Sequence, residues 1–343
     1  MESPGFCFVD KTSYLLYPHF MLTPDQLAVI NSPEKSSLFL RGPAGAGKTT
    51  CGVERIHFLL NGGIPAESIL VLTPQRTLQE AYLDAGKASW GQVAFATIGG
   101  LARRMVDLFW PLAIEIAGFK NPDQPPTFLT LETAQYHMSQ NVRPRLEGGW
   151  FDSVVMDRNR LYSQILDNLN KSAAVGFAHT DIGNRLASAW GGDPAQRRVF
   201  ADAQSCAIDF RHYCLDHNLL DFSLQLEVFS KLYWNEHQLR DYFIRQYRNV
   251  VYDSSEEDIP LAHDLMSDLL PDLDSALIIH DDDAGYRRFL GADPESALRL
   301  LPLCEKSMIF FDNFVANGSL IGIANKLSNF FTPVNDEILP IRM

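Results

Sequence analysis

The segment that most constrains the fold of this chain is residues 37–50, Ser-Leu-Phe-Leu-Arg-Gly-Pro-Ala-Gly-Ala-Gly-Lys-Thr-Thr. It fits the pattern G-x-x-x-x-G-K-[ST] through Gly42, Gly47, Lys48 and Thr49. The apolar residues before the loop predict a short buried strand, and the residues from Lys48 onward predict a helix. A glycine-rich turn between a strand and a helix is typical of a phosphate-binding loop.

The chemistry of phosphate binding explains each residue type in this loop. Glycines allow backbone N–H groups to close on phosphate oxygens without a Cβ in the way. The helix N-terminus adds the positive end of its dipole, Lys48 can reach the β- and γ-phosphates, and the Thr49 hydroxyl can ligate Mg²⁺. The expected nucleotide-binding residues of the loop are Gly42, Pro43, Ala44, Gly45, Ala46, Gly47, Lys48, Thr49 and Thr50.

Strand and helix patterns alternate on both sides of a long central segment. Residues 69–72 and 93–96 predict two strands after the loop, and residues 249–252, 276–279 and 308–311 predict three more late in the chain. Each apolar run ends in a polar loop, where open α/β sheets place their ligands. The alternation predicts an α/β fold with a parallel sheet flanked by helices.

The central segment interrupts this alternation. Its apolar side chains recur at steps of three and four, as on one face of an amphipathic helix, at Phe200, Ala203, Ala207, Phe210 and Cys214. We therefore divide the chain into a first α/β part, residues 1–110, an inserted all-helical subdomain, residues 111–248, and a second α/β part, residues 249–343.

Composition and charge exclude several classes of protein. The chain has 343 residues, of which 46% are hydrophobic and 21% charged, as in ordinary globular proteins. No run of about 18 apolar residues occurs, and the N-terminus lacks the pattern of a signal peptide, so we expect no membrane partner and a cytoplasmic location. The net charge of −13 argues against a globally basic nucleic-acid binder but leaves a local cationic groove open. Five scattered cysteines indicate reduced thiols: Cys7, Cys51, Cys206, Cys214 and Cys304.

Two residues outside the loop are candidates for the same site. Asp253 follows the predicted strand at residues 249–252, where it can hold Mg²⁺ through water beside Thr49. Gln26 lies on a predicted helix capped by Thr23, with Leu27 and Ile30 expected to face inward, and has both a donor and an acceptor for the edge of adenine. On spacing alone, Gln26 is interpreted as an ordinary surface residue.

In this order, the motifs resemble those of the UvrD/Rep group of superfamily 1 DNA helicases. The resemblance covers residues 22–327 and rests, beyond the phosphate loop, on residues 22–29, 69–80, 97–100, 220–226 and 280–294. It implies a RecA-like P-loop NTPase core with a helical insertion, ATP or ADP and Mg²⁺ as cofactors, and Gln26 as an adenine contact. Phe314 is implied as a ring that stacks on adenine.

Three departures from the family pattern concern hydrolysis. Ser254 stands where the family has the glutamate that takes a proton from the attacking water, and serine is no base near neutral pH without an activating partner. Ala284 replaces the glutamine that senses the γ-phosphate, and Val315 replaces an arginine that stabilises the transferring phosphoryl group. Losing a positioned general base typically costs about 10²–10⁴-fold in rate, so we expect lost or much reduced hydrolysis.

Two alternatives remain open from the sequence. Glu256 or Glu257 lies in the same loop as Asp253 and is a substitute base in an active DNA-dependent ATPase or helicase. The chain can also be the first half of a split helicase, completed by a partner protein that supplies the second motor domain, because residues 249–343 reach only the beginning of that domain. One lobe alone is not expected to unwind DNA.

The expected nucleic-acid contacts are few. The resemblance implies Thr97, Arg287 and Phe289, the last as a ring on which a base can stack. Pro74 and Gly99 stand where the family has an aromatic residue and a histidine. Stacking on one ring is worth about 1–3 kcal/mol per base, so we expect weak binding of single-stranded DNA.

Overall fold

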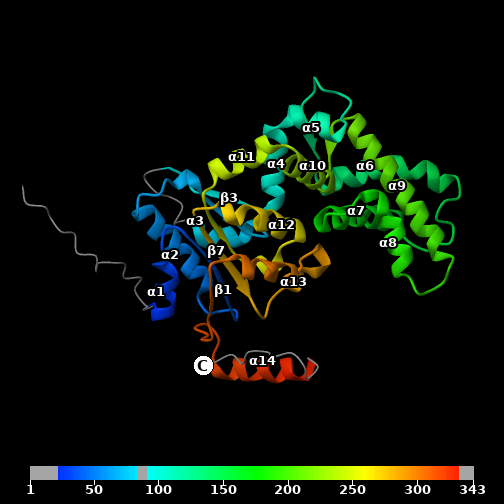
Figure 1. The fold of residues 1–343 in the computed structure, drawn as a ribbon. Coiled ribbons are helices and arrows are strands. Elements are labelled where there is room, and N and C mark those ends of the chain that lie inside the picture. The colour runs from blue at the N-terminus through cyan, green and yellow to red at the C-terminus, as the bar shows by residue number, and fades with distance from the viewer. Residues whose placement is uncertain (1–21, 84–90, 332–343) are drawn as a thin grey trace, which may run out of the picture.

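The computed structural model describes residues 22–83 and 91–331, and its centre is a six-stranded parallel sheet (Figure 1). The strands lie in the order β3-β2-β6-β7-β1-β8, with every neighbouring pair parallel. Their bounds are β1 Ser36–Gly42, β2 Ile69–Leu72, β3 Ala94–Ala96, β6 Asn249–Tyr252, β7 Ser275–Asp281 and β8 Lys306–Ile309. The α/β fold with a parallel sheet expected from the sequence is confirmed.

Strands β1, β2, β6 and β7 are buried on both faces, which explains their apolar runs, whereas the edge strand β8 is mostly exposed. Successive side chains point to opposite faces, so Phe39 enters one core while Leu38 and Leu40 enter the other. Helices α1 (Pro24–Ile30) and α2 (Lys48–Asn61) cover the Leu38 face. Helices α4 (Ile98–Leu108) and α12 (Pro260–Leu269) cover the Phe39 face.

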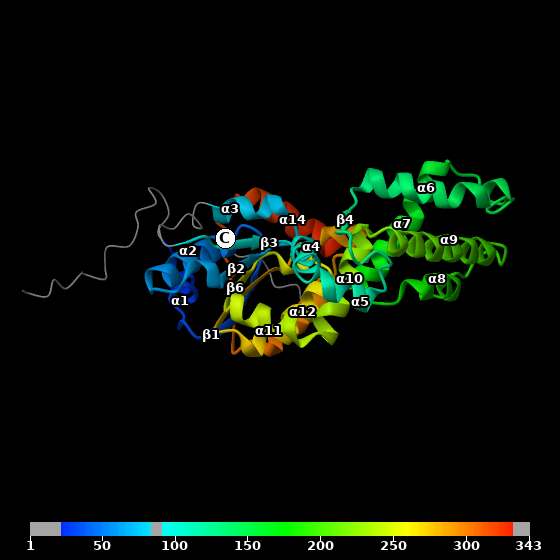
Figure 2. The same ribbon diagram turned by 90° about the horizontal axis from the view of Figure 1, so that it is seen from above.

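The insertion between β3 and β6 shares the Phe39 core and extends away from the sheet. Figures 1 and 2 both show α6, α7, α8 and α9 gathered at the end of the molecule farthest from the strands. The further helices of this segment are α5 Trp110–Ala117, α6 Leu131–Glu147, α7 Arg158–Val175, α8 Ile182–Ala189, α9 Gln196–Asp216, α10 Phe222–Asn235 and α11 His237–Gln246. The expected boundary at 110/111 falls one residue inside α5, and the boundary at 248/249 coincides with the start of β6.

The prediction that the insertion is all-helical is wrong in one detail. Two short strands, β4 (Thr127–Phe128) and β5 (Leu219–Leu220), pair in parallel within it. The strands are only two residues long and come from segments far apart in the sequence, so no period-two pattern announces them. A second correction concerns α1, in which Val29 and Ile30 are buried but Leu27, expected to face inward, is 42% exposed.

The last part of the described chain leaves the sheet. Its helix α14 (Gly318–Phe331) lies apart from the strands in Figure 1. Two short helices complete the α/β part, α3 (Glu80–Leu83) and α13 (Pro294–Ala297). Strand β8 ends at Ile309, two residues before the expected end at residue 311. Among the described residues, no helix is both long and apolar enough to cross a bilayer.

Candidate functional site

The glycine-rich loop connects β1 to α2 at the carboxyl edge of the sheet. Gly47 is the N-cap of α2 and has a left-handed backbone, with φ of 78° and ψ of 20°. The left-handed backbone favours glycine, and a Cβ at this position would also displace the Gln26 amide. The N–H groups of the first turn of α2 lack intrahelical carbonyl partners by geometry, which makes this end of the loop a donor surface for anions.

The Lys48 side chain lies folded back against the loop and is only 4% exposed. Its Nζ donates to the carbonyl oxygens of Gly42, at 2.9 Å, and Pro43, at 2.6 Å, and forms an ion pair with Asp281. A buried ammonium group is tolerated because it is paired and hydrogen-bonded on several sides. The loop thus holds a buried cation that is paired with one carboxylate and two carbonyl oxygens.

Asp253 and Thr49, which the sequence predicts to lie beside one another, come together at this edge. The Asp253 carboxylate follows β6, is 3% exposed and accepts a hydrogen bond from the Tyr82 hydroxyl at 2.6 Å, and the Thr49 hydroxyl lies close enough to lower its pKa. Burial raises the pKa of Asp253, and the nearby Asp281 charge adds to that effect, whereas the two hydroxyl donors oppose it. Tyr82 was not identified from the sequence, since nothing in the local pattern links it to Asp253.

The acidic loop after β6 places its two glutamates in different surroundings. Ser254 has a left-handed backbone (φ 60°, ψ 44°) and directs the chain into a short 3-10 helix, Ser255–Glu257. Glu256 is 1% exposed and accepts the N–H of Asp281 at 2.9 Å. Burial, with the charges of Asp281 and Asp253, raises the pKa of Glu256 to about 8.

Glu257 acts as an anchor for the next loop. Its carboxylate accepts three backbone N–H groups, from Gly285 at 2.9 Å, Tyr286 at 3.0 Å and Arg287 at 3.1 Å. These three hydrogen bonds occupy most of the acceptor sites of the carboxylate, and they hold the loop at residues 285–287 in place. Ala284, the residue before this anchored turn, is partly buried and offers only a methyl group.

Gln26 and Phe314 flank the loop at residues 45–47. Gln26 is 6% exposed, accepts the N–H of Thr23 at 2.9 Å and donates to the carbonyl of Ala46 at 3.3 Å, so one donor and one acceptor site of its amide remain free of these bonds. Phe314 is 44% exposed, and its N–H donates to the carbonyl of Gly45 at 2.9 Å. Gln26, Ala46 and Phe314 line one shallow depression.

The segment that carries Phe314 is fastened to the loop by Asn313. The Asn313 side chain donates to the carbonyl of Ala44 at 2.7 Å and accepts the N–H groups of Val315 and Ala316. Val315 is 84% exposed, so its side chain makes little contact with the site. Asn313 is a second residue whose role in the site is visible only in the structure.

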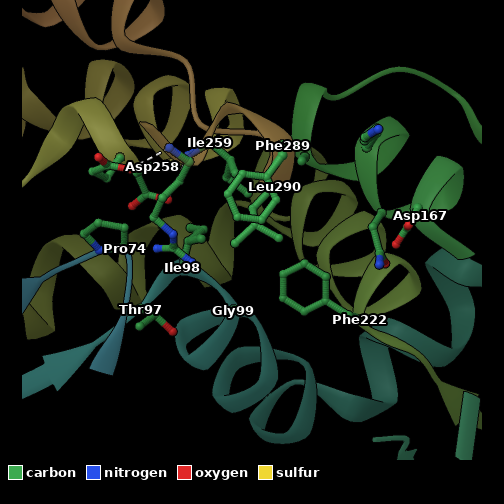
Figure 3. A pocket seen from close by; sticks show the side chains of 15 residues that line it. Pro74, Thr97, Ile98, Gly99, Asp167, Phe222, Asp258, Ile259, Phe289 and Leu290 are labelled. Carbon is green, nitrogen blue, oxygen red and sulfur yellow. Dashed lines mark hydrogen bonds between the residues drawn. The ribbon is translucent and has the colours of Figure 1, made fainter. Parts of the chain in front are cut away.

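A cavity of about 420 Å³ lies between the sheet edge and the insertion (Figure 3). The three residues expected to contact nucleic acid, Thr97, Arg287 and Phe289, all line it. Phe289 is 73% exposed and Phe222, which opens α10, is 47% exposed. Thr97 also has a structural task, because its hydroxyl accepts the N–H of Gly100 and caps α4.

The charge of this cavity is not that of a phosphate-binding groove. Its lining contains three carboxylates, Asp167, Glu257 and Asp258, against two cationic side chains, Lys171 and Arg287. Asp258 is buried, and burial raises its pKa to about 6 although Ile259 N–H and the Tyr252 hydroxyl donate to it. Aromatic and apolar surface is therefore the main feature that the cavity offers to a ligand.

Among the described residues, no group of three or more His, Cys, Asp or Glu side chains is arranged to hold a metal ion. Thr49 and Asp253 suit Mg²⁺ that takes its other ligands from phosphate oxygens and water, as is usual for that ion. No protein-family model matches the chain, and no curated protein matches it either.

The position of Glu256 gives a prediction on stability. Its pKa is raised from 4.5 to about 8 in the folded protein, so its neutral form stabilises the fold below pH 4.5 and that contribution is lost as the pH rises through about 8. We expect Glu256→Gln, which is always neutral, to increase the free energy of unfolding at pH 9 by about 2–4 kcal/mol and to change it little at pH 4.5.

Urea unfolding at both pH values measures this difference, with Glu305→Gln on an exposed side chain as the control. An effect of Glu256→Gln that is the same at pH 4.5 and pH 9 would contradict the burial of an ionisable group at this position.

Proposed function

We propose that this chain is a nucleotide-binding protein of the UvrD/Rep helicase type, which binds ATP or ADP with Mg²⁺ and has lost, or much reduced, ATP hydrolysis. The observation that carries the proposal is the meeting of the Thr49 hydroxyl, the buried Asp253 carboxylate and the buried Lys48 at the carboxyl edge of one parallel sheet. Phosphate loops use a hydroxyl, a carboxylate and a lysine in this combination to hold Mg²⁺ and the β- and γ-phosphates.

The surroundings of the acidic loop support the loss of hydrolysis. Ser254 has no general-base chemistry of its own at neutral pH. Glu257 is committed to three backbone N–H groups, and Glu256, with a pKa of about 8, is mostly protonated at pH 7. Neither glutamate is a ready substitute for the missing base, which disfavours the alternative of an active ATPase or helicase.

Weak binding of single-stranded DNA is the second part of the proposal. The cavity beside the nucleotide site offers the exposed rings of Phe222 and Phe289, on which bases can stack. Its mixed charge gives little electrostatic attraction for the phosphate backbone, which normally supplies most of the affinity. We expect no duplex unwinding by this chain alone.

A specific observation favours a protein contact at α14. Leu320, Ile323 and Leu327 lie three and four residues apart along α14, on one face of the helix, and each is more than half exposed. An apolar helix face in water is typical of a surface that another protein covers. The same segment of chain carries Phe314 at the nucleotide site, so a partner bound there would adjoin the nucleotide.

The first prediction of this proposal concerns affinity. Lys48→Ala removes a cation that forms charge-assisted hydrogen bonds to phosphate, so the dissociation constant for Mg·ATP or Mg·ADP should increase about tenfold to a hundredfold. Lys35→Ala, which removes an 85% exposed lysine, is the matched control and should change nothing. Calorimetry that finds no nucleotide binding by the unmutated protein at millimolar concentration would contradict the proposal.

The second prediction concerns turnover. We expect steady-state ATP hydrolysis far below the roughly 1–10³ s⁻¹ common among enzymes, with or without single-stranded DNA. If DNA-stimulated hydrolysis of several turnovers per second is found, the comparison of Glu256→Gln with Glu257→Gln identifies the base. Activity that rises from pH 7 to pH 9 and disappears in Glu256→Gln would establish the active-ATPase alternative.

The third prediction concerns the cavity. Phe289→Ala should weaken binding of a fluorescent oligothymidylate by about fivefold to a hundredfold, because stacking on one ring is worth about 1–3 kcal/mol per base. Tyr286→Ala removes an aromatic ring that is also exposed but does not line the cavity, and serves as the control. If both variants lose the same affinity for the oligonucleotide, the DNA does not bind in this cavity.

A further inference from the structure

Three successive aspartates after β7 contact the phosphate loop from one side. Asp281 forms an ion pair with Lys48, Asp282 accepts a hydrogen bond from Arg41 Nε at 2.8 Å, and Asp283 accepts the backbone N–H of Ala44 at 2.8 Å. Two of these contacts are to the phosphate loop itself. Asp281 contacts the Lys48 ammonium group, and Asp283 contacts the backbone N–H of Ala44. A carboxylate resembles a phosphate group in charge sign and in its hydrogen-bond acceptors, so it competes for the same donors.

The two occupied donors lie at one end of the phosphate site. The lysine of a phosphate loop reaches the β- and γ-phosphates, and Lys48 Nζ is held at the carbonyl of Pro43, the residue before Ala44. Ala44 N–H and Lys48 Nζ are therefore neighbours at the terminal-phosphate end. The N–H groups of the first turn of α2, which face the α- and β-phosphates, are at the other end of the loop.

The aspartate segment is held in place by further contacts. Asp282 N–H donates to the carbonyl of Gly42 at 3.1 Å, which continues the pairing of β7 with β1. On the other side, Glu257 binds the N–H groups of residues 285–287. A terminal phosphate must displace the Asp283 carboxylate from Ala44 N–H and the Asp281 carboxylate from Lys48, although the hydrogen bonds above hold this segment in place. The negative charge of the phosphate is also repelled by the two carboxylates.

We propose that Asp283, together with Asp281, occupies the position of a terminal phosphate and makes this site selective for nucleoside diphosphates over nucleoside triphosphates. A diphosphate uses the donors at the start of α2 and leaves the Asp283–Ala44 hydrogen bond intact. The inference rests on the proposed nucleotide-binding function and specifies which nucleotide that site prefers.

Calorimetry of the full chain with ADP and with ATP, each in the presence of Mg²⁺ and again in EDTA, tests this selectivity. We expect the unmutated protein to bind ADP about tenfold more tightly than ATP, the difference corresponding to one charge-assisted hydrogen bond. Asp283→Ala should increase the affinity for ATP about tenfold and change the affinity for ADP less than about twofold. Asp283→Asn, which keeps an acceptor for Ala44 N–H but removes the charge, should give a smaller increase.

Asp282→Ala is the matched control, because it removes the same charge one residue away without touching a donor of the phosphate loop. Equal effects of Asp282→Ala and Asp283→Ala would overturn the inference in favour of general repulsion. ATP binding as tight as ADP binding in the unmutated protein, or a selectivity that Asp283→Ala and Asp283→Asn leave unchanged, would also overturn it while leaving the proposed nucleotide site standing. Absence of binding by either nucleotide would instead remove the proposed function, and the inference with it.

Discussion

The carboxyl edge of the sheet depends on how one buried cation is held. Lys48 is almost inaccessible to water, and an ammonium group in that position is stable only with partners on several sides. The loop supplies two carbonyl oxygens, and Asp281 supplies the counter-charge. This arrangement requires β7 to lie next to β1, where the parallel register pairs Gly42 with Asp281 and brings the carboxylate to the mouth of the loop.

The segment after β7 then connects two sites. Its first residues contact the phosphate loop through Asp281 and Asp283, its middle is fastened to Glu257, and its end supplies Arg287 and Phe289 to the cavity. A ligand in the cavity and the nucleotide that we propose for the loop would therefore contact the same short stretch of chain. Any free energy of coupling between the two sites has to be reciprocal, since each ligand shifts the same contacts.

The sequence was informative where function depends on local pattern and much less so where it depends on distant partners. The loop, the strand at residues 249–252 and the cap of α1 by Thr23 are local features, and the structure has all three. The short strand pair β4–β5 and the exposure of Leu27 were missed, because pairing and burial are set by what packs against a residue rather than by its neighbours in sequence. The contact of Tyr82 with Asp253 joins residues 171 positions apart and has no sequence signal.

By itself, the sequence determined the residue types of the candidate site: glycines for a tight loop, a lysine and a threonine at the start of a helix, an aspartate at the end of a strand, and the absence of a glutamate beside it. These follow from short-range backbone geometry and side-chain chemistry. Only the tertiary structure decided which groups meet. It brought the Thr49 hydroxyl to Asp253, buried Glu256 beside Asp281, and placed Asp283 on the N–H of Ala44 in the glycine-rich loop. The physical reason is that strand order and register, which bring these residues to one edge, are fixed by burial of both faces of the sheet and not by any one segment of the chain.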